Sequence, residues 1–229
     1  MFDADEKIVP GALRPKDAAT LVLVKRERSG ARVLMGCRHS ASAFMANKYV
    51  FPGGRVDPGD LRLDVGSELR PEVAAKASID ITKGRARGLA LAAIRETFEE
   101  TGVLLGERST TLPRTRSPGW VRFFAHGILP RLDVLDLIAR AITPPNRPRR
   151  FDARFFMVDA GAIGHTLTST DNEELLETAW LTLGEARALD LANITRRVLD
   201  EVEARLSDGL TRPVPFFRIL RGKTVMTHI

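Results

Sequence analysis

Three glutamates with helical spacing carry the strongest chemical signal in this sequence. Glu96, Glu99 and Glu100 occupy positions i, i+3 and i+4 of the segment Arg95–Val103. Residues at these spacings are neighbours about 5–6 Å apart at Cβ on a helix, so the three carboxylates should share one patch. Each like-charged pair destabilises an isolated helix by roughly 0.2–0.5 kcal/mol, and a divalent cation would turn that repulsion into ligation.

The ligand type narrows the choice of metal. Carboxylate oxygens without cysteine or histidine favour Mg²⁺ or Mn²⁺ over Zn²⁺. A competing interpretation is a solvated acidic helix face on which Arg95 pairs with Glu99 one turn later. For the three acids alone, this second interpretation is the more common one.

A glycine-rich segment upstream shifts the balance towards a metal site. The sequence Tyr49-Val-Phe-Pro-Gly-Gly-Arg-Val-Asp-Pro-Gly-Asp60 places Gly53 and Gly54 where a backbone can approach a ligand or metal closely. Together with the acidic helix it resembles the Nudix box, G-x5-E-x7-R-E-U-x-E-E-x-G-U with U aliphatic. Gly54, Asp60, Arg95, Glu96, Glu99, Glu100, Gly102 and Val103 occupy the matching positions.

The match departs from the family pattern at three places. Asp60 replaces the usual Glu, Thr97 stands at an aliphatic position, and Leu61–Ile94 separates Asp60 from Arg95 where the pattern has seven residues. A loop can contain such an insertion, at about 61–88, because the entropic cost of closing a loop grows only slowly with its length. If the insertion lines the entrance to the site, deleting Arg62–Gly88 should change which substrates are accepted; otherwise it is a passive surface elaboration.

The resemblance covers Val33–Val103 and, more weakly, Arg147–Leu189. It implies an α+β fold, a Nudix-type αβα sandwich with a mixed β-sheet and extra helices. The interrupted box and the stretch Arg149–Phe156 look like the branch that contains the coenzyme A diphosphatases. The implied reaction is metal-dependent hydrolysis of a nucleoside-diphosphate-linked small molecule at the diphosphate, with coenzyme A or an acyl-CoA as one candidate substrate.

The resemblance also implies roles for individual residues. Glu96, Glu99 and Glu100 would bind Mg²⁺ or Mn²⁺, with the Gly54 carbonyl as a further ligand, and Arg95 would orient a carboxylate through a charge-assisted hydrogen bond. The general base is open between the box helix and a distant loop acid, for which Glu173 and Glu174 are candidates. Four arginines are candidates for holding terminal phosphates, each equally explained as a structural surface residue: Arg38, Arg149, Arg150 and Arg154.

Two other function classes compete with the enzyme. A Nudix-fold module that binds a nucleotide without hydrolysing it would be expected to lose box carboxylates, and all three remain here. A nucleic-acid-binding domain would explain the net charge of +6, but the sequence shows no recognition helix, zinc knuckle or aromatic RNA-binding strand. We therefore expect a small-molecule nucleotide as partner and no nucleic acid; the oligomeric state is open, with a homodimer as one alternative.

Around these motifs the pattern predicts an irregular mixture of strands and helices. Gly184–Leu189 and Asn193–Leu206 should be closing helices, so the chain should end in a helical extension from about residue 190. Further strands are expected at Asp17–Lys25, Arg32–Arg38, Tyr49–Phe51, Phe155–Val158 and Thr178–Leu183; further helices at Pro71–Asp80, Leu89–Thr101, Trp120–Leu132 and Leu135–Ile142; and a basic loop at Lys83–Gly88.

Length and composition fit one elaborated domain over residues 1–229. The chain has 229 residues, of which 44% are hydrophobic and 28% charged, as in ordinary globular proteins. The only cysteine, Cys37, forms no internal disulfide, and no apolar run reaches the roughly 20 residues that span a bilayer. With an acidic start at Met1–Glu6, these features predict a cytoplasmic protein without a membrane partner.

Overall fold

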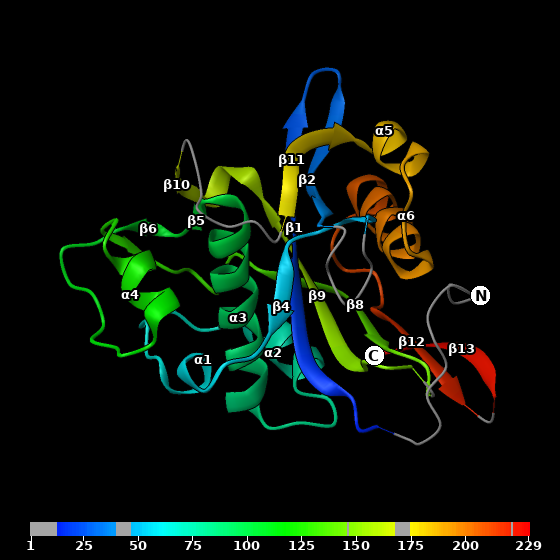
Figure 1. Ribbon diagram of the computed structural model, residues 1–229, viewed down its shortest axis with the longest axis horizontal. Coiled ribbons are helices and arrows are strands. Elements are labelled where there is room, and N and C mark those ends of the chain that lie inside the picture. The colour runs from blue at the N-terminus through cyan, green and yellow to red at the C-terminus, as the bar shows by residue number, and fades with distance from the viewer. Residues whose placement is uncertain (1–12, 40–46, 146, 168–174, 221) are drawn as a thin grey trace.

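A nine-stranded mixed sheet forms the centre of the part of the chain that the structure describes (Figure 1). The computed structural model describes residues 13–39, 47–145, 147–167, 175–220 and 222–229. The strand order is β11-β2-β1-β9-β8-β12-β13, with β3 on β2 and β4 on β1. The strands are β1 (Lys16–Glu27), β2 (Gly30–Arg38), β3 (Tyr49–Val50), β4 (Gly53–Arg55), β8 (Asp136–Ile142), β9 (Phe151–Asp159), β11 (Leu175–Thr182), β12 (Pro215–Leu220) and β13 (Lys223–His228).

Helices cover both faces of this sheet. β1 pairs with β9, and β8 with β12, in parallel, whereas the other pairs are antiparallel. The prediction of an α+β fold with a mixed sheet and helices is therefore confirmed. The helices on one face are α1 (Pro58–Arg62), α2 (Pro71–Ala77), α3 (Lys83–Thr101) and α4 (Pro118–Phe124), and those on the other are α5 (Leu183–Ala188) and α6 (Asn193–Asp208).

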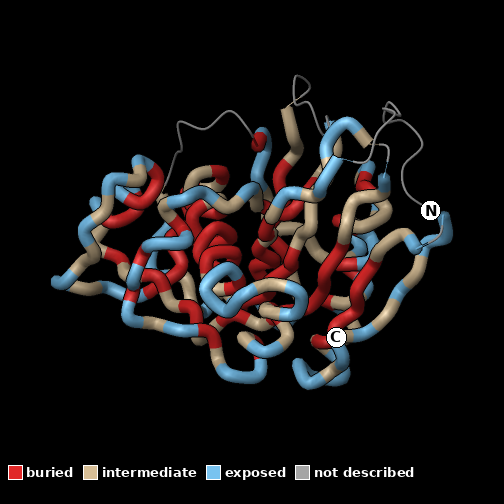
Figure 2. Tube along the Cα trace, turned by 90° about the horizontal axis from the view of Figure 1, so that it is seen from below, coloured by how far each residue is buried: buried red, intermediate tan, exposed pale blue. Residues whose placement is uncertain are grey.

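Side-chain alternation along the strands divides the core in two. Leu21 and Leu23 of β1 pack with α2, α3 and α4, whereas Val22 and Val24 pack with α5 and α6. Successive strand residues point to opposite faces, so one strand serves both cores. Figure 2 shows buried positions gathered in the interior of the fold and exposed positions along the outer loops.

Short strands extend the fold at the end of the box helix. β5 (Val103–Leu105) pairs with β10 (Ile163–Thr166), which follows a 3-10 turn at Ala160–Ala162. β6 (Glu107–Arg108) pairs with β7 (Ile128–Leu129).

One glycine begins a strand and another ends a helix, where the sequence predicts a turn and a helix cap. Gly30 has a φ of 122° in the turn between β1 and β2, and Gly102 caps α3 with a φ of 71° while its amide donates to the Phe98 carbonyl. Both values lie in the region that L-residues with a side chain avoid. The β1–β2 hairpin and the end of the box helix are thus confirmed.

Three predicted elements are wrong. The segment Leu135–Ile142, expected to be a helix, contains strand β8, because a strand buried on both faces is apolar at consecutive positions and resembles a buried helix. The expected basic loop Lys83–Gly88 is the start of α3, where the Thr82 hydroxyl accepts a hydrogen bond from the Arg85 amide. The expected helix Trp120–Leu132 ends at Phe124, before Gly127 with a φ of 69°.

The chain after residue 190 is only partly helical. Helix α6 is present, but it is followed by the hairpin of β12 and β13, and β12 joins β8 in the central sheet. The helical extension expected there is therefore part helix and part sheet. No helix in the described ranges combines the length and hydropathy that crossing a membrane requires.

Candidate active site

Arg95 is the centre of the acidic patch on α3. Its Nη1 donates to Glu96 Oε1 at 2.9 Å and to Glu99 Oε2 at 2.7 Å. Its Nη2 donates to the carbonyl of Arg55 on β4 at 2.9 Å. One guanidinium thus joins two acidic side chains of α3 and the strand beside them.

Asp60 fixes Arg95 from the opposite side. The two Asp60 carboxylate oxygens each lie 3.0 Å from Arg95, accepting from Nε and Nη2 in the bidentate geometry typical of strong charge-assisted pairs. Asp60 also accepts from Trp120 Nε1 at 2.7 Å and from the Asp57 amide at 2.8 Å. Asp60 is fully buried, and the shorter side chain at this box position therefore has a complete set of partners.

Burial and these hydrogen-bond partners shift the pKa of Arg95 in opposite directions. Burial favours the neutral form, but the hydrogen bonds to Asp60 and the charges of Glu96, Asp60 and Glu99 outweigh it and raise the pKa of Arg95 above its ordinary value. Arg95 is therefore a fixed cation at any pH at which the protein is folded.

Glu96 and Glu100 lie against the two glycines of β4. A Cβ atom on Gly54 would overlap the Glu96 carboxylate, so only glycine leaves room for this side chain. The amide of Gly53 donates to Glu100 Oε2 at 2.8 Å, and Glu100 is 2% exposed. The glycine pair therefore brings a backbone and two carboxylates into contact.

Glu99 faces away from β4 towards α4. Its Oε1 accepts from Arg122 Nη2 at 2.8 Å, and its carboxylate lies beside the backbone of Gly119. Among the described residues, no three acidic, histidine or cysteine side chains form a ready-made metal cluster. Glu99 is instead held by Arg95 and Arg122, so a bound metal would have to replace one of these two cations.

The donor set nevertheless fits a hard divalent cation. Glu96, Glu99 and Glu100 lie within two turns of one helix, and the backbone of Gly53 and Gly54 adjoins two of them. All the donors offered are oxygens, which Mg²⁺ and Mn²⁺ prefer.

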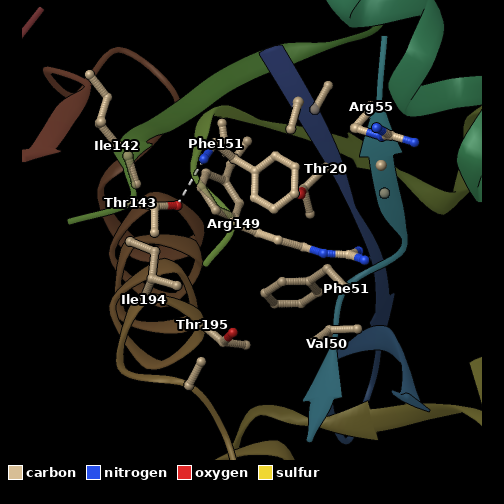
Figure 3. A pocket seen from close by; sticks show the side chains of 18 of the residues that line it. Thr20, Val50, Phe51, Arg55, Ile142, Thr143, Arg149, Phe151, Ile194 and Thr195 are labelled. Atoms are coloured by element: carbon tan, nitrogen blue, oxygen red, sulfur yellow. Dashed lines mark hydrogen bonds between the residues drawn. The ribbon is translucent and has the colours of Figure 1, made fainter. Parts of the chain in front are cut away.

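A pocket of about 350 Å³ opens beside Glu96 and Gly54. Phe51, Phe151 and Phe155 form apolar walls, and the first residues of α6 also line it. Figure 3 shows Ile194 and Thr195 of α6 on one side of the pocket, Arg55 of β4 on the other, and Phe51 between them. The pocket thus extends from the acidic patch to the N-terminal end of α6.

Two of the four arginines proposed for phosphate binding line this pocket. Arg38 and Arg149 are both lining residues. Arg150 donates to the carbonyls of Thr143 and Leu13 and lies outside the lining. Arg154 is fully buried on the opposite face, where it donates to the carbonyls of Ala77 and Ile79, so the structure gives it a role in the fold.

The insertion at 61–88 also lies away from the pocket. None of its described residues is among those that line the cavity, and six of them, including Leu63 and Val73, belong to the core beneath α3. The described cavity thus gives no support to an entrance lined by the insertion, and the buried residues show that the insertion is more than a surface elaboration. It is part of the packing that supports the box helix.

Sequence reasoning missed two contributors. Trp120 had no motif around it, and its indole reaches Asp60 only because α4 packs on α3. Thr195 lines the pocket from α6, and its only signal was its place near the start of a predicted helix. The loop acids Glu173 and Glu174, candidates for the general base, lie outside the described residues.

Known proteins similar to this chain include a worm protein and a bacterial enzyme of known structure. The chain is 31% identical over 153 residues to the Caenorhabditis elegans protein named "Putative nudix hydrolase 7", covering 62% of this chain and 44% of that protein. It thus spans less than half the length of that curated relative. No protein-family model matches the chain.

The structural comparison covers more of the chain. The crystal structure of a NUDIX hydrolase from Alicyclobacillus acidocaldarius is 26% identical, superposes with a TM-score of 0.64, and is matched over 89% of this chain and 100% of its own. The box residues, the fold around them and these relatives agree: the chain is similar in sequence and in structure to the Nudix hydrolase superfamily.

Proposed function

We propose that the protein is a Nudix hydrolase that cleaves the diphosphate linkage of a nucleoside-diphosphate-linked small molecule, with coenzyme A or an acyl-CoA as the candidate substrate. One observation carries the reaction type. Glu96 and Glu100 contact the Gly53–Gly54 backbone beside a pocket that Arg38 and Arg149 also line. The carboxylates can bind a divalent cation, and the arginines beside them can bind the phosphate groups that this cation neutralises. The coenzyme A assignment rests on the sequence resemblance alone.

Glu96, Glu99, Glu100 and the Gly54 carbonyl would hold Mg²⁺ or Mn²⁺. The bound ion supplies charge neutralisation on the diphosphate and a lowered pKa of the attacking water. Because Arg95 and Arg122 now hold Glu99, this carboxylate would have to exchange a guanidinium for the cation.

The remaining residues of the site orient the acidic side chains or contact the substrate. Asp60 and Trp120 hold Arg95, which in turn holds Glu96 and Glu99 in fixed directions. Arg149, which has no hydrogen bond or ion pair in the described part of the chain, is available for a phosphate oxygen. Phe51, which is 4% exposed, provides an apolar wall of the pocket.

Glu100→Gln tests the assignment directly. Glutamine keeps an oxygen that can accept from the Gly53 amide, but it removes the charge a divalent cation requires. We expect Mg²⁺- or Mn²⁺-dependent product release to fall at least about a hundredfold, with the melting temperature near that of the wild type. The matched control is Glu107→Gln, because Glu107 is exposed on β6 and lies outside the pocket.

The substrate is identified with the wild-type protein and a panel scored by product mass: coenzyme A, an acyl-CoA, ADP-ribose, NADH, dinucleoside polyphosphates and oxidised deoxynucleoside triphosphates. Near-wild-type activity in Glu100→Gln would contradict the metal-site assignment. Nucleotide binding without hydrolysis of any panel member, with either metal, would instead assign the protein to the non-catalytic nucleotide-binding modules.

A further inference from the structure

Helix α4 lies against the box helix α3 at Glu99. The backbone of Gly119 is so close to this side chain that an added Cβ would overlap Glu99 Oε1. Further along α4, Arg122 Nη2 donates a hydrogen bond to the same oxygen at 2.8 Å. Trp120, which lies between them in the sequence, donates to Asp60 at 2.7 Å and so ties α4 to the buried part of the site. Helix α4 therefore places a cation on one of the three box carboxylates.

The two arginines that hold Glu99 differ sharply in burial. The Arg95 side chain is 4% exposed, whereas that of Arg122 is 64% exposed. Arg95 also donates two hydrogen bonds to Asp60 and one to the Arg55 carbonyl. In the described part of the chain, Glu99 is the one hydrogen-bond and ion-pair partner of Arg122. Arg122 can therefore move into water without breaking other contacts, and Arg95 cannot.

The two arginines also hold different oxygens of the carboxylate. Arg122 binds Glu99 Oε1, and Arg95 binds Oε2 at 2.7 Å. If Arg122 leaves, one cation is removed from Oε1 while Arg95 still fixes the direction of the side chain. Breaking the exposed ion pair costs little, because water screens the charges and the long arginine side chain regains its rotational freedom. Breaking the Arg95 contacts would instead leave a buried charge without its partners.

We propose that Arg122 is a positioning residue that occupies Glu99 in place of the divalent cation and leaves when the cation binds. Competition for Glu99 and repulsion between like charges both weaken cation binding, so Arg122 sets the affinity of the site. This inference rests on the proposed function, because that function makes Glu99 a metal ligand. It gives α4, which carries none of the box residues, control over how much cation the protein needs.

The test measures cation binding directly, without substrate. The metal-stripped full chain is titrated with Mn²⁺, and the unbound ion is quantified by electron paramagnetic resonance. We expect Arg122→Gln to bind Mn²⁺ about two- to fivefold more tightly than the wild type, the gain corresponding to the loss of one exposed ion pair. Its urea unfolding midpoint without metal should stay near that of the wild type, because the Arg122 side chain is largely exposed.

Arg116→Gln is the matched charge control. Arg116 is exposed just before α4 and makes no hydrogen bond or ion pair in the described part of the chain, so this variant should keep the wild-type affinity for Mn²⁺. Unchanged or weaker binding in Arg122→Gln, or an equal gain in Arg116→Gln, would overturn the role of Arg122. Absence of Mn²⁺ binding in the wild type and both variants would contradict the metal site of the proposed function itself. Tighter binding in Arg122→Gln by a protein that hydrolyses nothing would support this inference and contradict only the proposed catalysis.

Discussion

Gly54 is the residue at which the lack of a side chain matters most to the site. Its backbone lies so close to the Glu96 carboxylate that an added Cβ would overlap three of that side chain's atoms. Its φ is not in the left-handed region, so alanine is compatible with the backbone itself. The constraint at this position is therefore imposed by Glu96, and the side chain of Glu96 can move to relieve it.

Gly54→Ala should consequently separate activity from stability. We expect Glu96 to be displaced and kcat to fall about a hundredfold, the loss typical of a misplaced catalytic group, while the unfolding midpoint in urea changes little. Gly84→Ala is the control, because a Cβ there meets no atom within 4 Å and Gly84 lies at the far end of α3. A Gly54→Ala variant with wild-type kcat would show that Glu96 does not need its present position.

At the scale of elements, alternation along β9 explains why Arg154, which the sequence presents as a phosphate-binding candidate, does not reach the pocket. Phe151, Ala153 and Phe155 face the pocket, so Arg154 must face the other side of the sheet, where α2 lies. The sequence pattern predicted a strand only from Phe155, and this alternation could not be extended to Arg154. Side-chain direction depends on strand bounds, which are the least certain part of a prediction from one sequence.

The C-terminal end of α3 was predictable, because its sequence signals are local. Gly102, the acidic spacing and the Arg95 position identify the end of α3 from neighbouring residues alone. The beginning of α3 was not predictable in this way, because Gly84 and Gly88 resemble helix breakers. Gly88 has a packing function instead, since a side chain there would overlap Leu61 of α1. Contacts of this kind, like that between Trp120 and Asp60, join residues distant in sequence.

Arg154 joins the segment after α2 to the central sheet, so replacing Arg154 should affect the stability of the fold. Its Nε donates to the Ala77 carbonyl at 2.8 Å and its Nη2 to the Ile79 carbonyl at 3.0 Å, just after α2. Arg154→Met would leave these carbonyls without their donor and should lower the free energy of unfolding by about 3 kcal/mol. KM of the folded fraction should not change, because Arg154 does not line the pocket.

Arg149→Gln is the matched comparison for Arg154→Met, and it should change KM without changing stability. We expect its KM to rise and its urea unfolding curve to overlay that of the wild type, because Arg149 is exposed and makes no hydrogen bond or ion pair in the described part of the chain. An Arg154→Met variant with raised KM and normal stability would contradict the assignment of Arg154 to the fold.

At the scale of the whole molecule, the C-terminal hairpin is held by buried Arg205 of α6, which pairs with the partly buried Glu201. Arg205 is 1% exposed and donates to the carbonyls of Leu210, Arg212 and Pro213, which lead into β12. Its Nε lies 2.9 Å from Glu201 Oε1. Because β12 joins β8 in the central sheet, this pair links α6, the hairpin and the wall of the pocket into one structure.

The same pair should make stability depend on pH. Burial, the largest effect, raises the pKa of Glu201 above 4.5 even though Arg205 and Arg212 act to lower it. Between 4.5 and the raised value the native state binds more protons than the unfolded state, so the free energy of unfolding should decrease as pH rises. Glu201→Gln should flatten this decrease in urea unfolding measured at a series of pH values above 4.5.

Glu203 is the control for the sign of the effect, because its hydrogen bond to Arg187 lowers its pKa. Glu203 is more than half exposed, so Glu203→Gln should change the pH profile only slightly, and in the opposite direction. A Glu201→Gln profile parallel to that of the wild type would show that Glu201 titrates alike in the native and unfolded states. In that case the Glu201–Arg205 pair would hold the hairpin without any pH-dependent cost to the fold.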